Sequence, residues 1–385
     1  MTNNPFYKLR PIFSFKVQFQ LQIMSFPYKQ SKKKIFITFQ LCFYLKKVTA
    51  ALKKNSKLLF LKIFSRFQIC YKMFSRLSNT AFELSVRYLH LDRVQKYLPS
   101  VQAKMGQMHS QPILKKYQTL SVQILPALED NYMYLVYDNH NKNTVIIDPC
   151  DATLVSNFLK ENPELNPIAI LATHHHWDHV GGIIELQEIY DGKLKVFGGD
   201  TRIDGLTEKI IREGSIDLDE NLKFEVIFTP CHTTGHVCFY NEKDGIIFTG
   251  DTLFITGCGR FFEGTGEQMN QNLNQMLCKL PDQTEIFCGH EYTTGQIMFA
   301  KAIESSNKNL DILEEKCKKL RAENKPTIPG TIGQEKLTNP FMRLESKEIQ
   351  KSIGYLNSDS SQAVVNFGEV MTVLRRYKDS WRPTN

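Results

Sequence analysis

The sequence predicts an α/β fold: an αβ/βα sandwich followed by a C-terminal α-helical domain. Between residues 120 and 290, short apolar runs alternate with segments that have apolar residues at helical spacing. Several runs end in a loop with His or Asp, whereas strand signals nearly vanish after residue 292. Packed sheets with outer helices would gather such loops at one edge. We therefore expect an extension over residues 1–117, the sandwich over 118–292 and a helical domain over 293–385.

The N-terminal extension differs in charge from the rest of the chain. Residues 1–100 hold 19 Lys and Arg against two acidic residues, a net charge of +17, whereas the remainder has a net charge of −9. Because most of this segment shows no sustained apolar period, we expect it to be disordered. Three interpretations stay open: an organelle transit peptide, a basic arm for nucleic acid or anionic membranes, or translation that starts later, at Met73, Met105 or Met108.

The cysteines and the apolar runs limit where the protein can reside. Nine cysteines lie scattered along the chain without a C-x-x-C pair, which favours free thiols in a reducing compartment over a disulfide framework. No uncharged apolar run reaches the roughly 18 residues that a membrane helix needs. We therefore expect no transmembrane segment, and a location in the cytoplasm or the mitochondrial matrix.

The order of the elements follows from composition and spacing. Runs of β-branched and aromatic residues predict strands at 120–125, 132–137, 144–147, 168–172, 194–197, 222–228, 237–240, 246–248 and 285–288. Apolar residues at helical spacing predict helices at 152–161, 183–190, 267–280, 297–305, 310–323 and 368–381. Pro163 ends the first of these helices, and Pro167 precedes the strand at 168–172.

The stretch T-H-H-H-W-D-H at 173–179 lies between a predicted strand and a predicted helix. Alternate side chains of an extended backbone share one side, so His174 and His176 are expected to point together while His175 points away. Asp178 and His179 begin the next element and can face the same space. Imidazole and carboxylate groups are ligands for zinc, iron or manganese, so the stretch predicts a metal site.

Further His and Asp residues follow later strands. The candidate metal ligands are His174, His176, Asp178, His179, His232, Asp251 and His290. Seven ligands exceed what one tetrahedral ion can use, so we expect two ions, which a carboxylate such as Asp251 can bridge. Two ions about 3.5–4 Å apart would hold a hydroxide that is nucleophilic near neutral pH. His236 is interpreted as a group that supports a ligand or caps a helix, and His90, His109 and His140 as bystanders.

Four stretches resemble the metallo-β-lactamase superfamily. They are T-H-H-H-W-D-H at 173–179, T-P-C-H at 229–232, F-T-G-D-T-L-F at 248–254 and C-G-H-E-Y at 288–292. Within the superfamily, the segments 130–132, 257–264, 339–343 and 375–378 look like the glyoxalase II (hydroxyacylglutathione hydrolase) family. The resemblance runs from about residue 120 to the C-terminus. It implies a metallo-β-lactamase-type sandwich with a helical substrate-binding domain.

The resemblance implies a role for each candidate ligand. One divalent ion would be held by His174, His176 and His232, the other by Asp178, His179 and His290, with Asp251 as the bridge. Zinc is the expected metal, with iron or manganese as alternatives. A hydroxide that bridges the two ions would attack a thioester carbonyl, and Asp251 and Asp178 are the catalytic side chains that this chemistry requires.

The implied substrate is S-lactoylglutathione, an S-(2-hydroxyacyl)glutathione that is hydrolysed to glutathione and D-lactate in the second step of methylglyoxal detoxification. The residues that match substrate-binding positions are Arg260, Phe262, Tyr292, Arg375 and Lys378. Cations suit the two carboxylates of glutathione. Phe262 stands where some relatives have Tyr, so a side-chain hydrogen bond would be lost there. Arg375 and Lys378 also fit a solvated helix face.

Other functions remain as alternatives to this thioester hydrolase. One is another hydrolase of the same fold, and a second is a glutathione persulfide dioxygenase, which keeps one iron and lacks the helical tail. A non-enzymatic alternative is a nucleic-acid-binding protein that uses the basic N-terminal arm. The complete ligand set favours the binuclear hydrolase. We further expect a monomer without a nucleic-acid partner.

Overall fold

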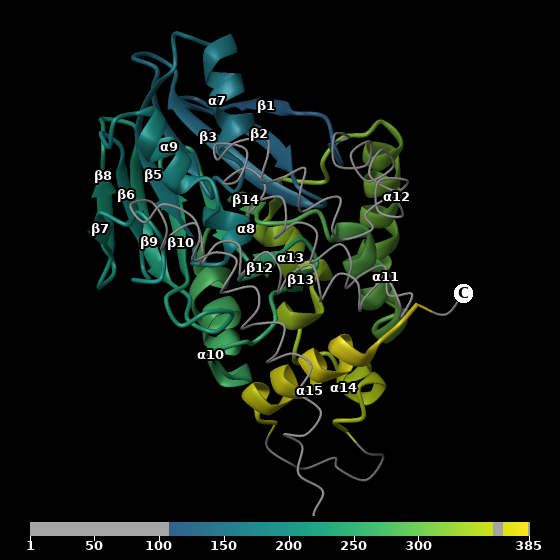
Figure 1. Cartoon of the computed structure of the whole chain (residues 1–385). Coiled ribbons are helices and arrows are strands. Elements are labelled where there is room, and N and C mark those ends of the chain that lie inside the picture. Colours follow the sequence, from purple (N-terminus) through teal and green to yellow (C-terminus); the bar gives the residue numbers. More distant parts are fainter. Residues whose placement is uncertain (1–107, 357–364, 384–385) are drawn as a thin grey trace, which may run out of the picture. The chain divides into compact units, whose positions relative to one another are not determined.

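The computed structural model describes residues 108–356 and 365–383, in which two β-sheets pack face to face around a common core (Figure 1). The first sheet has seven strands in chain order. They are β1 Ile113–Lys116, β2 Leu120–Ala127, β3 Asn131–Asp138, β4 Asn143–Ile147, β5 Asn166–Ala172, β6 Lys195–Gly198 and β7 Glu208–Lys209. Neighbours from β1 to β4 are antiparallel, and those from β4 to β7 are parallel.

Alternating side chains along these strands explain the layers. In β3, Tyr134 contributes to the core between the sheets, whereas Leu135 lies in a second core. The second core also holds residues of α7 (Ala152–Glu161) and α9 (Ile183–Ile189), the helices that cover the first sheet (Figure 1). A strand that is buried on both faces needs apolar residues at successive positions, which is why these strands read as continuous apolar runs.

The second sheet has six strands and provides most of the aromatic core. In spatial order they are β15 Gly330–Thr331, β14 Glu285–Cys288, β11 Ile246–Gly250, β10 Val237–Asn241, β9 Lys223–Phe228 and β8 Gly214–Asp217. Phe248 of β11 and Phe287 of β14 stack with ring centroids 5.2 Å apart. Tyr134 of the first sheet meets Phe248 edge-on, also at 5.2 Å. These rings join the two sheets and fix β11 and β14 against the first sheet.

The loops with His or Asp leave the ends of strands in both sheets. β5 leads through residues 173–176 into α8 (Trp177–Val180), and β9 leads into residues 229–236. β11 ends directly before Asp251, and β14 ends two residues before His290. Because β11 and β14 are parallel, their carboxyl ends meet at one edge, as the sequence predicts.

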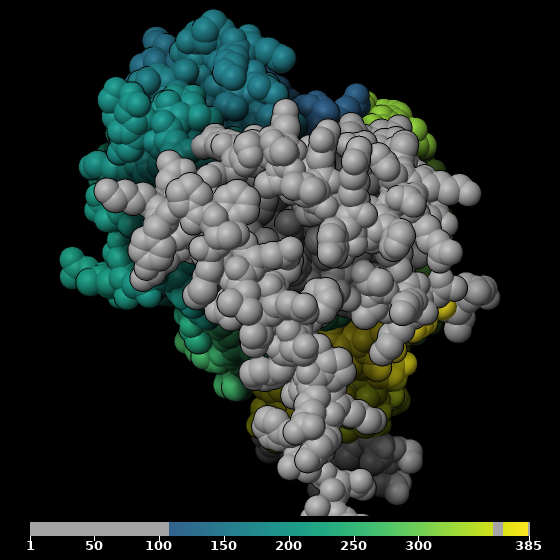
Figure 2. Space-filling view, in the orientation of Figure 1, coloured from purple at the N-terminus to yellow at the C-terminus, as the bar shows by residue number. Residues whose placement is uncertain are grey.

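Helices dominate the chain beyond the sandwich, as expected. They are α11 Thr293–Ile303, α12 Lys308–Ala322, α13 Ile332–Thr338, a short 3-10 turn Pro340–Met342, α14 Lys347–Ser352 and α15 Phe367–Ser380. α15 packs on α10 (Gly266–Asn270), and a side chain at Gly266 would collide with Gly368 and Thr372 of α15. In the space-filling view the yellow C-terminal helices border the green surface of α10 (Figure 2). The last helix is therefore held against the sandwich.

Some local features differ from the sequence expectations. Strand β1 lies inside the segment assigned to the N-terminal extension, yet it pairs with β2 along its whole length. An edge strand of four residues with two lysines offers no apolar run to detect. The helix expected at 267–280 is divided into α10, a π-helical segment Gln271–Met276 and a 3-10 turn Leu277–Lys279. The very short β7, β8, β15 and the hairpin of β12 (Leu253–Phe254) and β13 (Gly257–Cys258) carry no clear sequence signal either.

Two further expectations concern the N-terminal extension and membrane-spanning helices. Disorder is predicted for the extension, and its residues 1–107 lie outside the part of the chain that the structure describes. Within residues 108–356 and 365–383, no helix has both the length and the hydropathy of a membrane span.

Candidate metal centre

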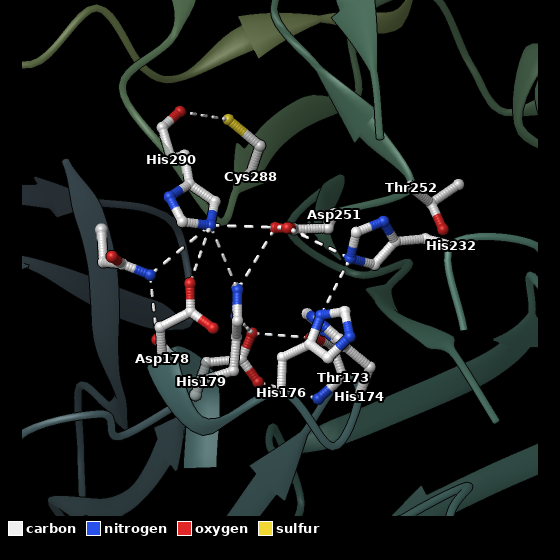
Figure 3. Close-up of polar contacts among 12 residues, drawn as sticks. Thr173, His174, His176, Asp178, His179, His232, Asp251, Thr252, Cys288 and His290 are labelled. Atoms are coloured by element: carbon white, nitrogen blue, oxygen red, sulfur yellow. Dashed lines mark hydrogen bonds and ion pairs between the residues drawn. The ribbon is translucent and has the colours of Figure 1, made fainter. Parts of the chain in front are cut away.

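Three sets of His and Asp side chains, each of three residues, lie where the loops at the strand ends meet (Figure 3). They are His174–His176–His232, His174–His179–Asp251 and Asp178–His179–His290, and within each group the ligand atoms lie within 4.8 Å of one another. All seven predicted ligands belong to at least one group. The fold thus brings the complete set together from four separate loops.

The first trio, His174, His176 and His232, presents three ring nitrogens to one point. His176 Nδ1 lies 3.0 Å from His174 Nε2 and 3.1 Å from His232 Nε2. Ligand atoms on a tetrahedral ion at about 2.1 Å are about 3.4 Å apart, so this spacing suits one divalent ion. His174 is buried whereas His176 is partly exposed, so the trio opens toward the surface on the His176 side.

The second trio, Asp178, His179 and His290, lies beside the first. His290 Nε2 lies 3.3 Å from His179 Nε2 and 3.7 Å from Asp178 Oδ2. Two imidazole nitrogens and one carboxylate oxygen again converge at the separation that one coordinated ion would impose.

Asp251 lies between the two trios. Its Oδ2 is 3.4 Å from both His232 Nε2 and His290 Nε2, and its Oδ1 is 3.3 Å from His179 Nε2. The carboxylate is buried, and Oδ1 accepts no hydrogen bond from the described residues. A buried carboxylate costs free energy unless a cation neutralises its charge. The donor set therefore fits two divalent ions, one at each trio, and Asp251 would be available to both.

Carboxylates hold the imidazoles of the second trio from behind. His179 Nδ1 donates to Asp148 Oδ2 at 2.9 Å, and His290 Nδ1 donates to Asp130 Oδ1 at 2.8 Å. A carboxylate only accepts, so each Nδ1 keeps a proton and each Nε2 is the atom available to an ion. Burial lowers the pKa of His290, but Asp251 and Asp130 outweigh burial and raise it to about 9. The pKa of His179 is likewise raised, against its burial, by Asp251 and Asp148.

Neutral groups hold the first trio. His232 Nδ1 donates to the carbonyl oxygen of Arg260 at 2.9 Å, and His174 Nδ1 lies 3.1 Å from Thr173 Oγ1. Burial lowers the pKa of His174 and of His232. Burial, with the neighbouring His232, lowers the pKa of His176 to about 4. These three imidazoles are neutral at pH 7 and need lose no proton to bind an ion.

His236 supports Asp251 and is not in any of the ligand groups. Its Nε2 accepts the backbone N–H of Asp251 at 3.1 Å, so its Nδ1 carries the proton and faces Thr229 Oγ1 at 2.9 Å. Its ring stacks on His174 with centroids 5.0 Å apart. The supporting role expected for this residue agrees with these contacts.

His175 points away from the trios, as the period-two geometry predicts. Its Nδ1 lies 3.3 Å from Asp200 Oδ2, and it is in none of the ligand groups. The middle histidine of the motif therefore serves another set of contacts.

Asp148 is a site residue that sequence analysis misses. Its carboxylate is buried and accepts the backbone N–H of Thr173 at 2.8 Å and the Thr173 hydroxyl at 2.7 Å, besides the contact with His179. The backbone of Asp148 has a φ of 50°, an unusual value for a residue other than Gly. A signal was present, because Asp148 directly follows a buried apolar strand in the same way as Asp251 does.

Three of the predicted substrate residues flank the ligands. The Phe262 ring lies 5.1 Å from the His232 ring, and its side chain is 59% exposed. Tyr292 stacks on His290 with centroids 4.7 Å apart, and burial raises the pKa of its hydroxyl, so it stays protonated. The exposed Arg260 side chain lies 3.4 Å from Asp379.

The other two, Arg375 and Lys378, lie on α15 in different surroundings. Arg375 is buried, and it donates to the Cys258 carbonyl oxygen at 3.1 Å and to Asp379 Oδ1 at 2.9 Å. Lys378 Nζ lies 4.5 Å from the centre of the Phe299 ring, and burial lowers its pKa to about 8. The alternative of a solvated helix face is therefore wrong for Arg375.

Comparisons with known proteins match both parts of the chain. The metallo-beta-lactamase superfamily matches residues 128–290, and the hydroxyacylglutathione hydrolase C-terminus matches residues 291–381. The hydroxyacylglutathione hydrolase of Shewanella halifaxensis is 42% identical over 264 residues, which are 68% of this chain and 100% of the relative. That of Photobacterium profundum is 43% identical over 262 residues, 68% of this chain and 100% of the relative. Hydroxyacylglutathione hydrolase cytoplasmic of Arabidopsis thaliana is 37% identical over 264 residues, 67% of this chain and 98% of the relative.

Proposed function

This chain belongs to the hydroxyacylglutathione hydrolase family of the metallo-beta-lactamase superfamily, and we propose that it hydrolyses S-lactoylglutathione to glutathione and D-lactate. It is a thioester hydrolase of the glyoxalase II type. The observation that carries the proposal is the convergence of seven His and Asp donors at one edge of the sandwich. This reaction is the second step of methylglyoxal detoxification.

Each trio would hold one divalent ion, with Asp251 shared between them. Bound there, the ions would supply a water that is nucleophilic near neutral pH and an electrophile for the carbonyl oxygen. Donor sets of imidazole and carboxylate suit zinc, iron and manganese. We favour zinc, because three imidazoles with an open position are typical of catalytic zinc sites.

The chain's own groups would keep this centre rigid during turnover. Asp148 and Asp130 orient the imidazoles of the second trio, and His236 fixes the backbone of Asp251. Fixed donors need no rearrangement when charge develops on the carbonyl oxygen, which is how preorganised sites lower a barrier. The leaving thiolate is a weak base, so the proposal requires no dedicated general acid.

The cations around the centre would bind the glutathione part of the substrate. Arg260 and Lys378 are the predicted substrate cations that retain some exposure, and the two carboxylates of glutathione call for such groups. Residues 293–385 would thus form the substrate-binding domain. Phe262 and Tyr292 would flank the thioester, with no hydroxyl on the Phe262 side.

The remaining proposals concern location and assembly. The seven cysteines in the described part of the chain are free thiols, and six of them are buried. This fits a reducing compartment, either the cytoplasm or the mitochondrial matrix. A monomer is proposed because both trios and their supporting groups come from one chain.

One assay with metal analysis on the same sample tests the proposal. The purified full chain should hydrolyse S-lactoylglutathione and contain about two metal ions per chain. A folded sample that holds one tightly bound iron and consumes oxygen with a glutathione persulfide would contradict it.

A further inference from the structure

A cluster of polar contacts lies beside His175, the motif histidine that is not in any of the ligand groups. His175 Nδ1 lies 3.3 Å from Asp200 Oδ2. Arg202 donates to Asp200, with Nε 2.9 Å from Oδ1 and Nη2 2.6 Å from Oδ2. The same guanidinium donates to Glu263, with Nη1 2.5 Å from Oε1 and Nη2 2.7 Å from Oε2. Arg202 therefore joins two carboxylates, each through a pair of hydrogen bonds.

The second of these carboxylates belongs to the loop of residues 259–264, called here the substrate loop because it carries Arg260 and Phe262. Glu263 Oε2 also accepts the backbone N–H of Thr234 at 2.8 Å and the Thr234 hydroxyl at 3.0 Å. Thr234 lies two residues after a ligand of the first trio. The contacts of Arg202 and Glu263 thus connect the substrate loop to residues 229–236, the loop that supplies His232, and to Asp200 beside His175.

The charges and the geometry make this connection firmer than an ordinary surface ion pair. Hydrogen bonds with Glu263 and Asp200 raise the pKa of Arg202, and those from Arg202 lower the pKa of Glu263, so both groups are charged at neutral pH. The Asp200 side chain is only 8% exposed, although that of Arg202 is 45% exposed. Two-pronged Arg–carboxylate contacts within a network contribute more than isolated exposed pairs do. A lysine could not form both pairs at once.

We propose that Arg202 is a positioning residue for substrate binding: through Glu263 it holds the substrate loop so that Arg260 can meet a carboxylate of the glutathione thioester. This inference rests on the proposed function. Arg202 is not among the metal-ligand groups, so its removal should weaken binding of the glutathione part more than the chemical step. Backbone bonds at both ends of the loop, from Gly259 N to Thr252 O at 3.4 Å and from Glu263 N to Cys231 O at 3.2 Å, would remain.

The test uses Arg202→Met in the full chain, since methionine keeps the apolar stem and removes the charge. KM for S-lactoylglutathione should rise about three- to tenfold, while kcat changes less than about twofold. Hydrolysis of a small alkyl thioester without glutathione, and a content of two metal ions, should match the parent. Arg212→Met is the matched control, because Arg212 is exposed and forms no ion pair with any described residue. The control should keep the KM of the parent.

Companion variants decide the outcome. Glu263→Gln should raise KM as Arg202→Met does, the double variant should be no worse than either single variant, and Arg202→Lys should recover part of the loss. An unchanged KM would overturn the proposal, and so would equal losses on both thioesters or a loss of metal, which indicate a structural role. If Arg202→Met fails to fold, Glu263→Gln gives the deciding KM. A parent chain without thioester hydrolysis would refute the proposed function instead.

Discussion

The metal centre and the substrate rim (Arg260, Phe262, Tyr292, Arg375 and Lys378) are held in different ways. In the centre, each trio contains imidazoles whose second nitrogen is bound by another group, such as Asp148 or a backbone carbonyl. In the rim, Phe262 is 59% exposed and Arg260 has one loose contact with Asp379. Donors for a metal must be held within a few tenths of an ångström, whereas contacts to a flexible tripeptide can adjust. Substitutions in the centre should therefore abolish the chemistry, and most of those in the rim should change binding.

The largest effect is expected for Asp251→Ala. Removal of the carboxylate between the two trios should lower kcat by about a thousandfold or more, because the two proposed ions would lose a donor that lies between their ligand sets. His175→Ala should keep both ions, because His175 is in none of the ligand groups and its Nδ1 lies 3.3 Å from Asp200 Oδ2 instead. Thioester hydrolysis and metal counting on both variants provide the check. If His175→Ala lost metal as fully as His174→Ala, the ligand assignment would be wrong.

A smaller effect is expected when a support of the second trio is weakened. Asp148→Asn keeps the shape of the side chain but removes the charge that faces His179. Such supporting groups typically contribute ten- to a hundredfold to metal affinity, so the variant should lose one ion at limiting metal and keep the other. Asp191→Asn is the control, since the Asp191 side chain is 80% exposed. Zinc titration by calorimetry measures both sites. Equal loss of both ions would contradict a selective effect on the second trio and would mean that Asp148 also supports His174 through Thr173.

The centre could be predicted from the sequence because its information is local. The ligands at 174–179 lie close together in one loop, and Asp251 and His290 lie within two residues of the ends of β11 and β14. Strand ends that share an edge then bring these loops together without any knowledge of side-chain packing. Asp148 was not recognised as a site residue, because a single acidic residue after a strand is also typical of an ordinary turn.

The rim could not be predicted to the same depth, because it depends on how α15 packs on the sandwich. A helical pattern places Arg375 and Lys378 on neighbouring turns, but it does not reveal that Arg375 is buried against the Cys258 carbonyl. The contact of Arg202 with Glu263 likewise joins residues 61 apart in the sequence, and no local spacing signals it. Long-range packing of this kind is decided by the whole fold.

Arg375 and Lys378 offer a way to separate structural from binding roles within the rim. Arg375→Ala should lower the free energy of unfolding by about 1–3 kcal/mol, because it leaves the buried Cys258 carbonyl without its partner. Lys378→Met should leave thermal stability nearly unchanged and raise KM for S-lactoylglutathione about tenfold. Denaturant unfolding and kinetics with both thioesters distinguish the two. A stable Arg375→Ala variant with a selective KM defect would place Arg375 among the substrate contacts instead.

The smallest effect is a pH dependence of KM. Burial lowers the pKa of Lys378 to about 8, so its positive charge is present below that pH and is lost as the pH rises through it. If the charged form binds a glutathione carboxylate, KM for S-lactoylglutathione should increase about two- to fourfold between pH 7 and 8.5, as the charged fraction falls.

Two controls separate this change from the titration of other groups. The small thioester without glutathione should show no such increase, because Lys378 would contact only the non-reacting part of the substrate. Lys378→Arg should have a flat KM over the same range, since a guanidinium keeps its proton throughout. An identical rise in KM for Lys378→Arg would mean that another group titrates, and Lys378 would then be a packing residue on the Phe299 ring.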